Sequence, residues 1–562
     1  MWGPNVTFWE KLGDLNQQAL ATLESESDRA DRFPVYDYFL VDRESAQDLQ
    51  LTSPGHAHYG LKRGSPKKNS REETTLFVGE GLISLVNQAP RISGFARSIL
   101  ESFVLMPERT LEGIQERQKI FRILSTDKAR EIKDLFAREA DFNYNEFVQI
   151  TDYIYSRCLV AESHEGVQDY LQKIAKIRAF FGIFGKISND PELKDIATAM
   201  RENQGERFEE LKRLLTSEKY TLQIAGDLTA ESVAFFTKTP EPNSERTDIL
   251  GKSVLSDRED YKESQTRRPE LGLFSEFLLN LFRDNYKPTA VRFITCMAGL
   301  EACAYYADAV HSSREVDWCL PEIVESDEPF IEIDGFVHPM YLRDRKVMGN
   351  LRIGGDRLVN VITGANDSGK TQLLRGLGQI VYLAMAGFPI PATKARMSLI
   401  NSIHTNFGGD DTAAKGRYKK ALSRWMDIFR RFDKKSLILG DEPTDGTFVE
   451  TGVKHGIKIL NALSRAGIPT LVTTHYHDIA SAVEAGKIPR AQNLHVKTKR
   501  REDGGLDFTR QITDGVDYLS YGEEVAEVVG FTDANLERVA SGENLEGARM
   551  TKKSFGGDEI LF

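Results

Sequence analysis

Residues 358–371 read LVNVITGANDSGKT, and this stretch decides the fold class of the chain. Its first part, Leu358 to Ile362, is a short apolar run that is typical of a buried strand. Its second part matches the phosphate-loop pattern G-x-x-x-x-G-K-[ST] at every fixed position. The residues of that match are Gly364, Ala365, Asn366, Asp367, Ser368, Gly369, Lys370 and Thr371. Apolar residues at helical spacing follow, from Leu373 to Ala384, and predict an amphipathic helix.

This loop has the chemistry of a phosphate cradle. Its glycines let the backbone curl so that successive N–H groups point at phosphate oxygens, and the following helix adds the positive end of its dipole. We expect Lys370 to reach the β- and γ-phosphates and the Thr371 hydroxyl to ligate a metal ion. The stretch therefore predicts a site for a nucleoside triphosphate, with ATP and Mg²⁺ as the expected ligands.

A second apolar stretch ends in two adjacent carboxylates. Residues 436–446 read SLILGDEPTDG, so Asp441 and Glu442 stand where a predicted strand ends. An Asp at that place can complete the magnesium shell, and the adjacent Glu can act as general base toward a water molecule. The order and spacing after the phosphate loop predict these two roles for Asp441 and Glu442.

A third stretch, residues 470–477, reads TLVTTHYH and ends a further predicted strand in histidine. A histidine at a strand end after the carboxylates matches the switch histidine of ABC-type ATPases. Such a side chain would bond the γ-phosphate or order the attacking water. His475 lies directly at the strand end and is the preferred candidate, with His477 as the alternative.

Composition sets limits on the class of protein. The chain has 562 residues, a formal net charge of −11, 40% hydrophobic and 28% charged residues. This length allows roughly three or four domains, and the net charge argues against a surface that coats nucleic acid everywhere. The four cysteines form no CxxC pair, so neither zinc nor a disulfide framework is indicated. With no secretory signal and no long apolar segment, we expect a cytoplasmic protein that has no membrane partner.

We interpret the chain as four parts. Residues 1–75 are an N-terminal segment that is partly disordered, and residues 76–325 are a helical domain with a polar insertion over about 200–270. Residues 326–540 alternate short apolar strands with helices, which is typical of a mostly parallel α/β domain. Residues 541–562 are polar and Gly-rich and are expected to form a flexible tail.

The N-terminal segment carries three weaker signals. Residues 8–23 could form an amphipathic helix and residues 36–41 a short strand. Residues 59–71 read YGLKRGSPKKNSR, a basic stretch whose Gly, Pro and Ser indicate a loop. This loop is either a nucleic-acid contact or a solvated linker.

Several further segments narrow the resemblance from ABC-type ATPases to the MutS family. The loop keeps that family's Asn at Asn366, and Thr474-His475-Tyr476 is similar to its "ATHY". Residues 384–396 and 403–411 resemble the family segments that follow the loop helix, the latter its "IFTRIGASDD". Further similar segments are Met106-Pro107, Glu116-Arg117-Gln118, residues 329–339, Tyr521-Gly522, Val525-Ala526 and Gly530-Phe531.

The resemblance implies an α/β ABC-type P-loop ATPase domain preceded by a mostly α-helical core and lever domain. Residues 200–270 would then be an insertion or a reduced clamp. It also implies a homodimer that closes around ATP and binds double-stranded or branched DNA. The chain before residue 75 has no room for the family's mismatch-reading domain, so we expect a divergent homologue that does not read mismatches. Two alternatives remain: an ATPase that acts on structured RNA or ribosomes, and an ATP-gated interaction protein with little turnover.

Two segments depart from the family pattern. The segment that should carry the signature Ser, residues 411–420, has Gly416-Arg417 with no Ser after it. Where the family has an aromatic residue that stacks on adenine, this chain has Val347 and Met348. Both departures put nucleotide contacts of the family in doubt.

A basic helix is expected shortly after the signature segment. Residues 415–435 contain nine basic and two acidic residues. They predict a helix with one apolar face, and its basic side chains either bind phosphates or are solvated. The predicted face consists of Leu422, Trp425, Met426 and Phe429.

Overall fold

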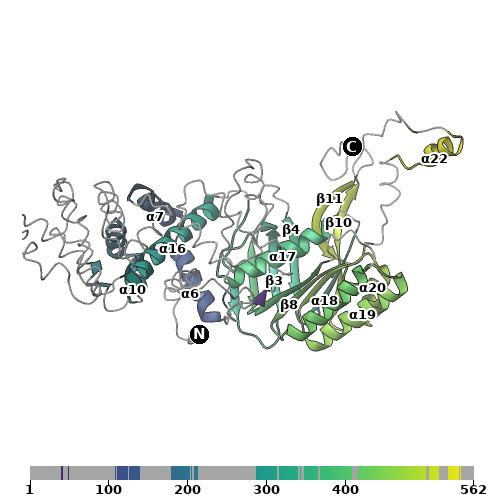
Figure 1. Ribbon diagram of the computed structural model, residues 1–562, viewed down its shortest axis with the longest axis horizontal. Helices are drawn as coiled ribbons and strands as arrows, with labels where there is room; N and C mark the ends of the chain where they lie inside the picture. The colour runs from purple at the N-terminus through teal and green to yellow at the C-terminus, as the bar shows by residue number, and fades with distance from the viewer. Residues whose placement is uncertain are drawn as a thin grey trace, which may run out of the picture. The chain divides into compact units, whose positions relative to one another are not determined.

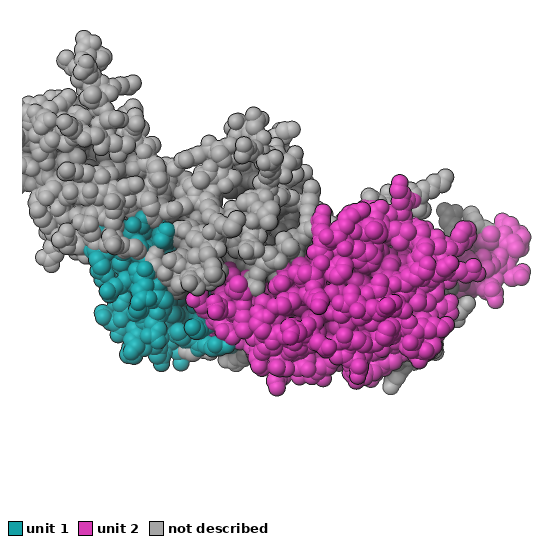
Figure 2. Space-filling model, turned by 90° about the horizontal axis from the view of Figure 1, so that it is seen from below, with its two compact units in different colours: residues 1–34, 86–103, 119–312 teal, residues 35–85, 104–118, 313–562 magenta. Residues whose placement is uncertain are grey.

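The structure of the protein is a computed structural model in which two compact units are distinguished (Figure 2). Unit 1 comprises residues 1–34, 86–103 and 119–312, and unit 2 comprises residues 35–85, 104–118 and 313–562. The described residues are 40–41, 49, 108, 110–124, 126–139, 179–202, 204, 208–209, 211–212, 287–312, 316–339, 342, 347–364, 368–407, 416–500, 506–517, 530–542 and 545.

Several expectations fall outside these residues. They are the helix over residues 8–23, the basic loop over 59–71, the signature segment up to residue 415, and most of the insertion and of the tail. The four-part division of the chain stays a prediction. Unit 2 does include residues 35–85 and 104–118, which that division assigned to the N-terminal segment and the helical domain.

Unit 2 is built on a seven-stranded sheet of mixed direction (Figure 1). Its strand order is β1-β7-β8-β9-β5-β10-β11, and all neighbours are parallel except the β10–β11 hairpin. The strands are β1 (Leu40–Val41), β5 (Val359–Thr363), β7 (Ser402–Phe407), β8 (Ser436–Asp441), β9 (Thr470–Thr473), β10 (Ala491–Arg500) and β11 (Leu506–Asp514). The apolar runs of β5 and β9 are buried throughout, as expected for parallel strands covered on both faces.

Helices cover both faces of this sheet. Ile438 of β8 packs with α18 (Arg417–Arg431) and α19 (Val449–Ala466), and the same face continues to α20 (His477–Glu484). The next residue, Leu439, points the other way, because side chains alternate along a strand. It lies beside Gly378 of α17 (Lys370–Met385), so α17 covers the opposite face. The predicted α/β layering is therefore present in unit 2.

Two segments from earlier in the chain pack on α17. The carbonyl of Leu49, near β1, accepts a hydrogen bond from Gln379 Nε2 at 2.8 Å. At the C-terminal end of α17, Arg117 donates to Ala386 O at 3.1 Å and pairs with Glu108 at 2.8 Å. Both partners of that pair are buried, so breaking it would leave an uncompensated charge inside the unit. These contacts fix the helix that starts at the phosphate loop.

A smaller sheet completes unit 2, together with one peripheral helix. Its order is β2-β6-β3-β4, with β3 antiparallel to both of its neighbours. The strands are β2 (Glu322–Val324), β3 (Ile331–Val337), β4 (Val347–Ile353) and β6 (Lys394–Ser398). The peripheral helix α22 (Asp533–Ala540) has no buried residue.

The described part of unit 1 is helical. Its elements are the C-terminal end of α6 (Leu111–Ile123), α7 (Thr126–Glu139), a helical stretch over residues 179–189, α10 (Lys194–Glu202) and α16 (Lys287–Ser312). Four phenylalanines form its aromatic core, with the rings of Phe181 and Phe293 stacked at 4.3 Å between centroids. Of the other two, Phe208 contacts both of these rings, and Phe184 contacts Phe293 and Phe208.

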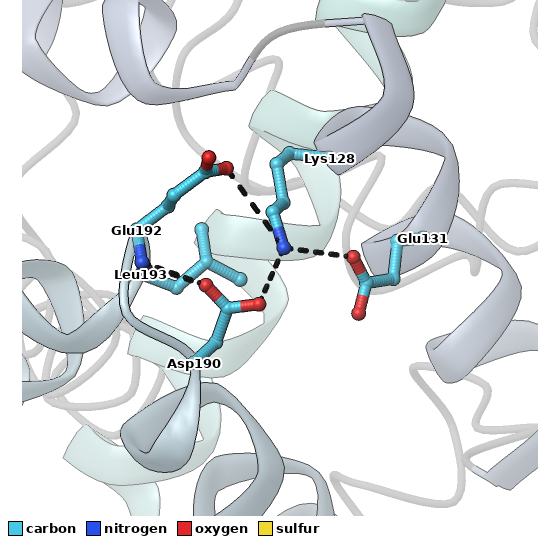
Figure 3. A network of polar contacts seen from close by, with 5 residues as sticks. All are labelled: Lys128, Glu131, Asp190, Glu192 and Leu193. Atoms are coloured by element: carbon cyan, nitrogen blue, oxygen red, sulfur yellow. Dashed lines mark hydrogen bonds and ion pairs between the residues drawn. The ribbon is translucent and has the colours of Figure 1, made fainter.

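A polar network ties α7 to the turn before α10 (Figure 3). The Lys128 ammonium pairs with Asp190 and, at 3.0 Å, with Glu131. Asp190 Oδ1 also accepts hydrogen bonds from the backbone N–H groups of Glu192 and Leu193, at 2.8 and 3.1 Å. Asp190 therefore satisfies donors at a helix entry and holds a cation at the same time.

None of the described helices has the length and apolar content that crossing a bilayer requires.

Candidate functional site

The phosphate-loop residues lie between the end of β5 and the start of α17. Gly364 and Gly369 have φ values of +146° and +91°, a region that side chains with a Cβ rarely adopt. Lys370 and Thr371 are the first two residues of α17. The predicted loop residues Ala365, Asn366 and Asp367 lie outside the described residues.

The described part of the loop fits a phosphate group. Lys370 is only 5% exposed, and its Nζ donates to Gly364 O at 2.9 Å, across the mouth of the loop. The Ser368 hydroxyl is buried and has no hydrogen-bond partner among the described residues. A Cβ on Gly364 would lie 3.3 Å from that hydroxyl, so only glycine leaves the space open. Donors that face a narrow cradle at an uncapped helix N-terminus are what a phosphate requires.

Asp441 is held by two threonine hydroxyl groups. Thr371 Oγ1 donates to Asp441 Oδ2 at 2.7 Å, and Thr473 Oγ1 donates to Oδ1 at 2.5 Å. Asp441 and Thr473 are paired residues at the ends of β8 and β9. No group of three or more His, Cys, Asp or Glu side chains in the described ranges could hold a metal ion. The Thr371 hydroxyl and the Asp441 carboxylate still fit Mg²⁺, which takes few protein oxygens beside phosphate and water.

Glu442 and His475 face each other at this edge of the sheet. His475 Nδ1 lies 3.2 Å from Glu442 Oε1, with side chains 41% and 31% exposed. The hydrogen bond from His475 lowers the pKa of the Glu442 carboxyl, against the effect of burial. The hydrogen bond to Glu442 raises the pKa of His475, also against burial. Both directions favour an ion pair.

The backbone at Glu442 is in an unusual conformation. Its φ is +48°, which is uncommon for a residue with a Cβ and is found preferentially at functional sites. Its N–H group is 3.2 Å from both the carbonyl and the hydroxyl oxygen of Thr473. The loop that follows is held by Trp425, whose indole N–H donates to Pro443 O at 3.0 Å.

The two candidate histidines lie at different places. His475 follows β9 and contacts Glu442, and His477 is the first residue of α20; both are exposed. The arrangement follows from the sheet order, because β9 lies between β8 and β5. The carboxyl ends of adjacent parallel strands meet at one edge, so the three predicted motifs converge.

Sequence reasoning missed Thr473, which contacts both acidic residues. The available signal was a polar residue at the end of an otherwise apolar strand. It also predicted the wrong environment for two methionines, Met348 and Met426. Met348 is 1% exposed and belongs to the core, so it cannot cover a base, whereas Val347 is 40% exposed. On α18, Met426 is 51% exposed, and the fully buried Ile428 packs in the core beside Trp425 instead.

Comparison with known proteins places the site within a matched family domain. Residues 360–544 match the family model "MutS domain V". The chain is 27% identical over 345 residues to "DNA mismatch repair protein MutS 1" of Haloarcula marismortui, covering 59% of this chain and 33% of that protein. It is 25% identical over 312 residues to "Probable DNA mismatch repair protein Msh6" of Drosophila melanogaster, covering 54% and 26%.

A longer match extends over most of the chain. It is 24% identical over 549 residues to "DNA mismatch repair protein MutS" of Finegoldia magna, covering 89% of this chain and 61% of that protein. The alignments with the first two relatives span a third or less of those proteins. The matched domain is an ATPase-type α/β domain, in agreement with the layers of unit 2. The domain match and the relatives together support a divergent member of the MutS family.

Proposed function

We propose that the chain is an ABC-type P-loop ATPase of the MutS kind, which binds ATP with Mg²⁺ and hydrolyses it. One observation carries the proposal: five side chains with complementary roles meet at the carboxyl ends of β5, β8 and β9. They are Lys370, Thr371, Asp441, Glu442 and His475, and four of them are linked pairwise by contacts of 2.7 and 3.2 Å. Membership of a family with an ATPase-type domain supports the same conclusion.

Each side chain has a task in this scheme. Lys370 would exchange the carbonyl of Gly364 for phosphate oxygens, and the Thr371 hydroxyl and the Asp441 carboxylate would hold Mg²⁺. The metal, when bound, offsets the negative charge of the phosphates. Glu442 takes a proton from the water whose oxygen attacks the γ-phosphorus. The bond from that phosphorus to the bridging oxygen breaks, and ADP leaves with phosphate.

His475 is the proposed γ-phosphate sensor. The hydrogen bond to Glu442 raises the pKa of His475, which favours the protonated imidazole that can donate to an anionic phosphate oxygen. In that state His475 would exchange its contact with Glu442 for the phosphate. Glu442 would then be released to act on water.

The variant Glu442→Gln tests the hydrolytic assignment. It keeps the size and hydrogen-bonding of the side chain but cannot accept the proton. We expect turnover to fall by about 10²-fold or more, while binding of ATP, measured by equilibrium titration with a fluorescent analogue, remains. Hydrolysis by the variant at the wild-type rate would show that Glu442 is not the base.

We further propose that two copies close around the nucleotide. The Glu442–His475 pair is 31–41% exposed, so the site is open on one side. A short distance along the chain, Phe448 and Val449 are 87% and 55% exposed, which is unusual for adjacent apolar residues. A second copy that covers them would remove these side chains from water.

The proposed cargo is double-stranded or branched DNA. The support is that the matched relatives are named DNA mismatch repair proteins. Electrophoretic mobility shifts with mismatched, branched and RNA duplexes over a salt series would test it. Binding through phosphate contacts is expected to show a logarithm of the affinity that falls linearly with the logarithm of the salt concentration. Tighter binding to RNA would favour structured RNA as the target. Absence of binding to all of these duplexes would refute a nucleic-acid role.

A further inference from the structure

The hydroxyl group of Thr473 connects the two acidic residues of the site. It donates to Asp441 Oδ1 at 2.5 Å and accepts from the backbone N–H group of Glu442 at 3.2 Å. The Thr473 side chain is fully buried at the end of β9, so water cannot replace it. A valine would fill the same volume without making either contact.

The two oxygens of Asp441 are held by different donors. Oδ2 accepts from Thr371 at 2.7 Å, and Oδ1 accepts from Thr473. In the proposed function the Thr371 hydroxyl would help to hold Mg²⁺, and it would then no longer be available for this first hydrogen bond. The bond from Thr473 does not depend on the metal. It therefore keeps the carboxylate from rotating, with Oδ2 on the side of Thr371.

The same hydroxyl supports Glu442. This residue has a φ of +48°, a conformation that surrounding contacts must stabilise. Its N–H group reaches Thr473 through both the strand carbonyl and the hydroxyl, each at 3.2 Å. The carboxylate of the same residue meets His475 at 3.2 Å.

We propose that Thr473 is a positioning residue, whose hydroxyl orients Asp441 for Mg²⁺ and Glu442 for water. The proposal rests on the function proposed above. Thr473 would lie behind the metal ligands. Partners in that position set metal affinity because they fix the orientation of the ligands.

The test compares Thr473→Val and Thr473→Ser in the full chain. Binding of a fluorescent, non-hydrolysable ATP analogue is titrated in EDTA and then at increasing Mg²⁺. We expect Thr473→Val to need about 10- to 100-fold more Mg²⁺ for half-maximal binding, with unchanged affinity in EDTA. Thr473→Ser restores the hydroxyl and should restore the wild-type Mg²⁺ dependence.

Thr470→Val is the matched control on the same strand. Thr470 is equally buried, and its hydroxyl donates to Ile468 O at 2.9 Å without contacting an acidic residue. This variant should keep the wild-type Mg²⁺ dependence. If Thr473→Val unfolds below the assay temperature, Thr473→Ala is compared with Thr473→Ser. Both substitutions make the side chain smaller, and only Thr473→Ser keeps the hydroxyl.

The outcomes distinguish the two proposals. Wild-type Mg²⁺ dependence in Thr473→Val, beside a wild type that hydrolyses ATP, overturns the role of Thr473 and leaves the ATPase standing. A wild type that binds the analogue equally with and without Mg²⁺, and hydrolyses nothing, overturns both. An equal loss in Thr470→Val would show a general effect on β9 and overturn the specific role.

Discussion

His475 lies two residues after the end of β9, with Glu442 as its partner at 3.2 Å. We expect His475→Ala to reduce turnover by about 10²-fold, a typical loss for one donor that stabilises developing charge. His477→Ala is the matched control, because His477 is also an exposed histidine but belongs to α20, and its loss should leave turnover unchanged. Steady-state hydrolysis rates decide between them. A larger loss in His477→Ala would reverse the assignment.

At the same scale, local pattern predicted the chemistry of the acidic pair and of the phosphate loop. It did not predict that one hydroxyl, that of Thr473, contacts both acidic residues, because that contact depends on the register of β8 against β9. Nor did it predict that Met348 is buried. Adjacent residues on a strand face opposite sides, and only packing decides which side is the core.

Among the elements, α19 carries the surface proposed for the second copy. Phe448 immediately precedes α19 and is 87% exposed. We expect Phe448→Ser to weaken ATP-dependent dimerisation, since it removes the exposed ring, while serine is a favourable residue at this N-cap position. Sedimentation or light scattering of the Glu442→Gln background with ATP measures the effect.

Phe448→Tyr is the control for that experiment, because it keeps the ring and should keep the dimer. Dimerisation that persists in Phe448→Ser at the same protein concentration would exclude this surface. Helix stability is checked independently by circular dichroism, so that loss of association can be separated from loss of α19.

For the whole molecule, the charged network of unit 1 makes stability depend on pH. The hydrogen bond from Lys128 lowers the pKa of the Asp190 carboxyl. Burial alone would raise the pKa of Asp308, but hydrogen bonds from Lys133 and Arg130 outweigh it and lower it. Carboxylates with depressed folded pKa values stabilise the fold above their unfolded pKa of about 4, and this contribution is lost as pH falls through the folded values.

We therefore expect the free energy of unfolding of unit 1 to fall as the pH drops from about 5 to about 3, a range around the unfolded pKa of Asp. Asp190→Ala should also cost about 1 kcal/mol near neutral pH through the lost helix-entry contacts. Asp190→Asn keeps an acceptor and should mainly flatten the pH dependence. Unfolding monitored by hydrogen exchange of residues 287–312 measures both the loss in Asp190→Ala and the pH dependence. Equal slopes of the unfolding free energy against pH in wild type and Asp190→Asn would contradict the assignment.

The sequence by itself determined the phosphate loop, the Asp441–Glu442 and His475 strand ends and the alternation of strands with helices. These features depend on residue spacing and side-chain chemistry within one segment. Only the tertiary structure decided that β9 lies between β8 and β5, that β1 pairs with β7, and that Thr473 reaches Asp441. Strand order and register are set by burial and pairing between distant segments, which no local pattern contains.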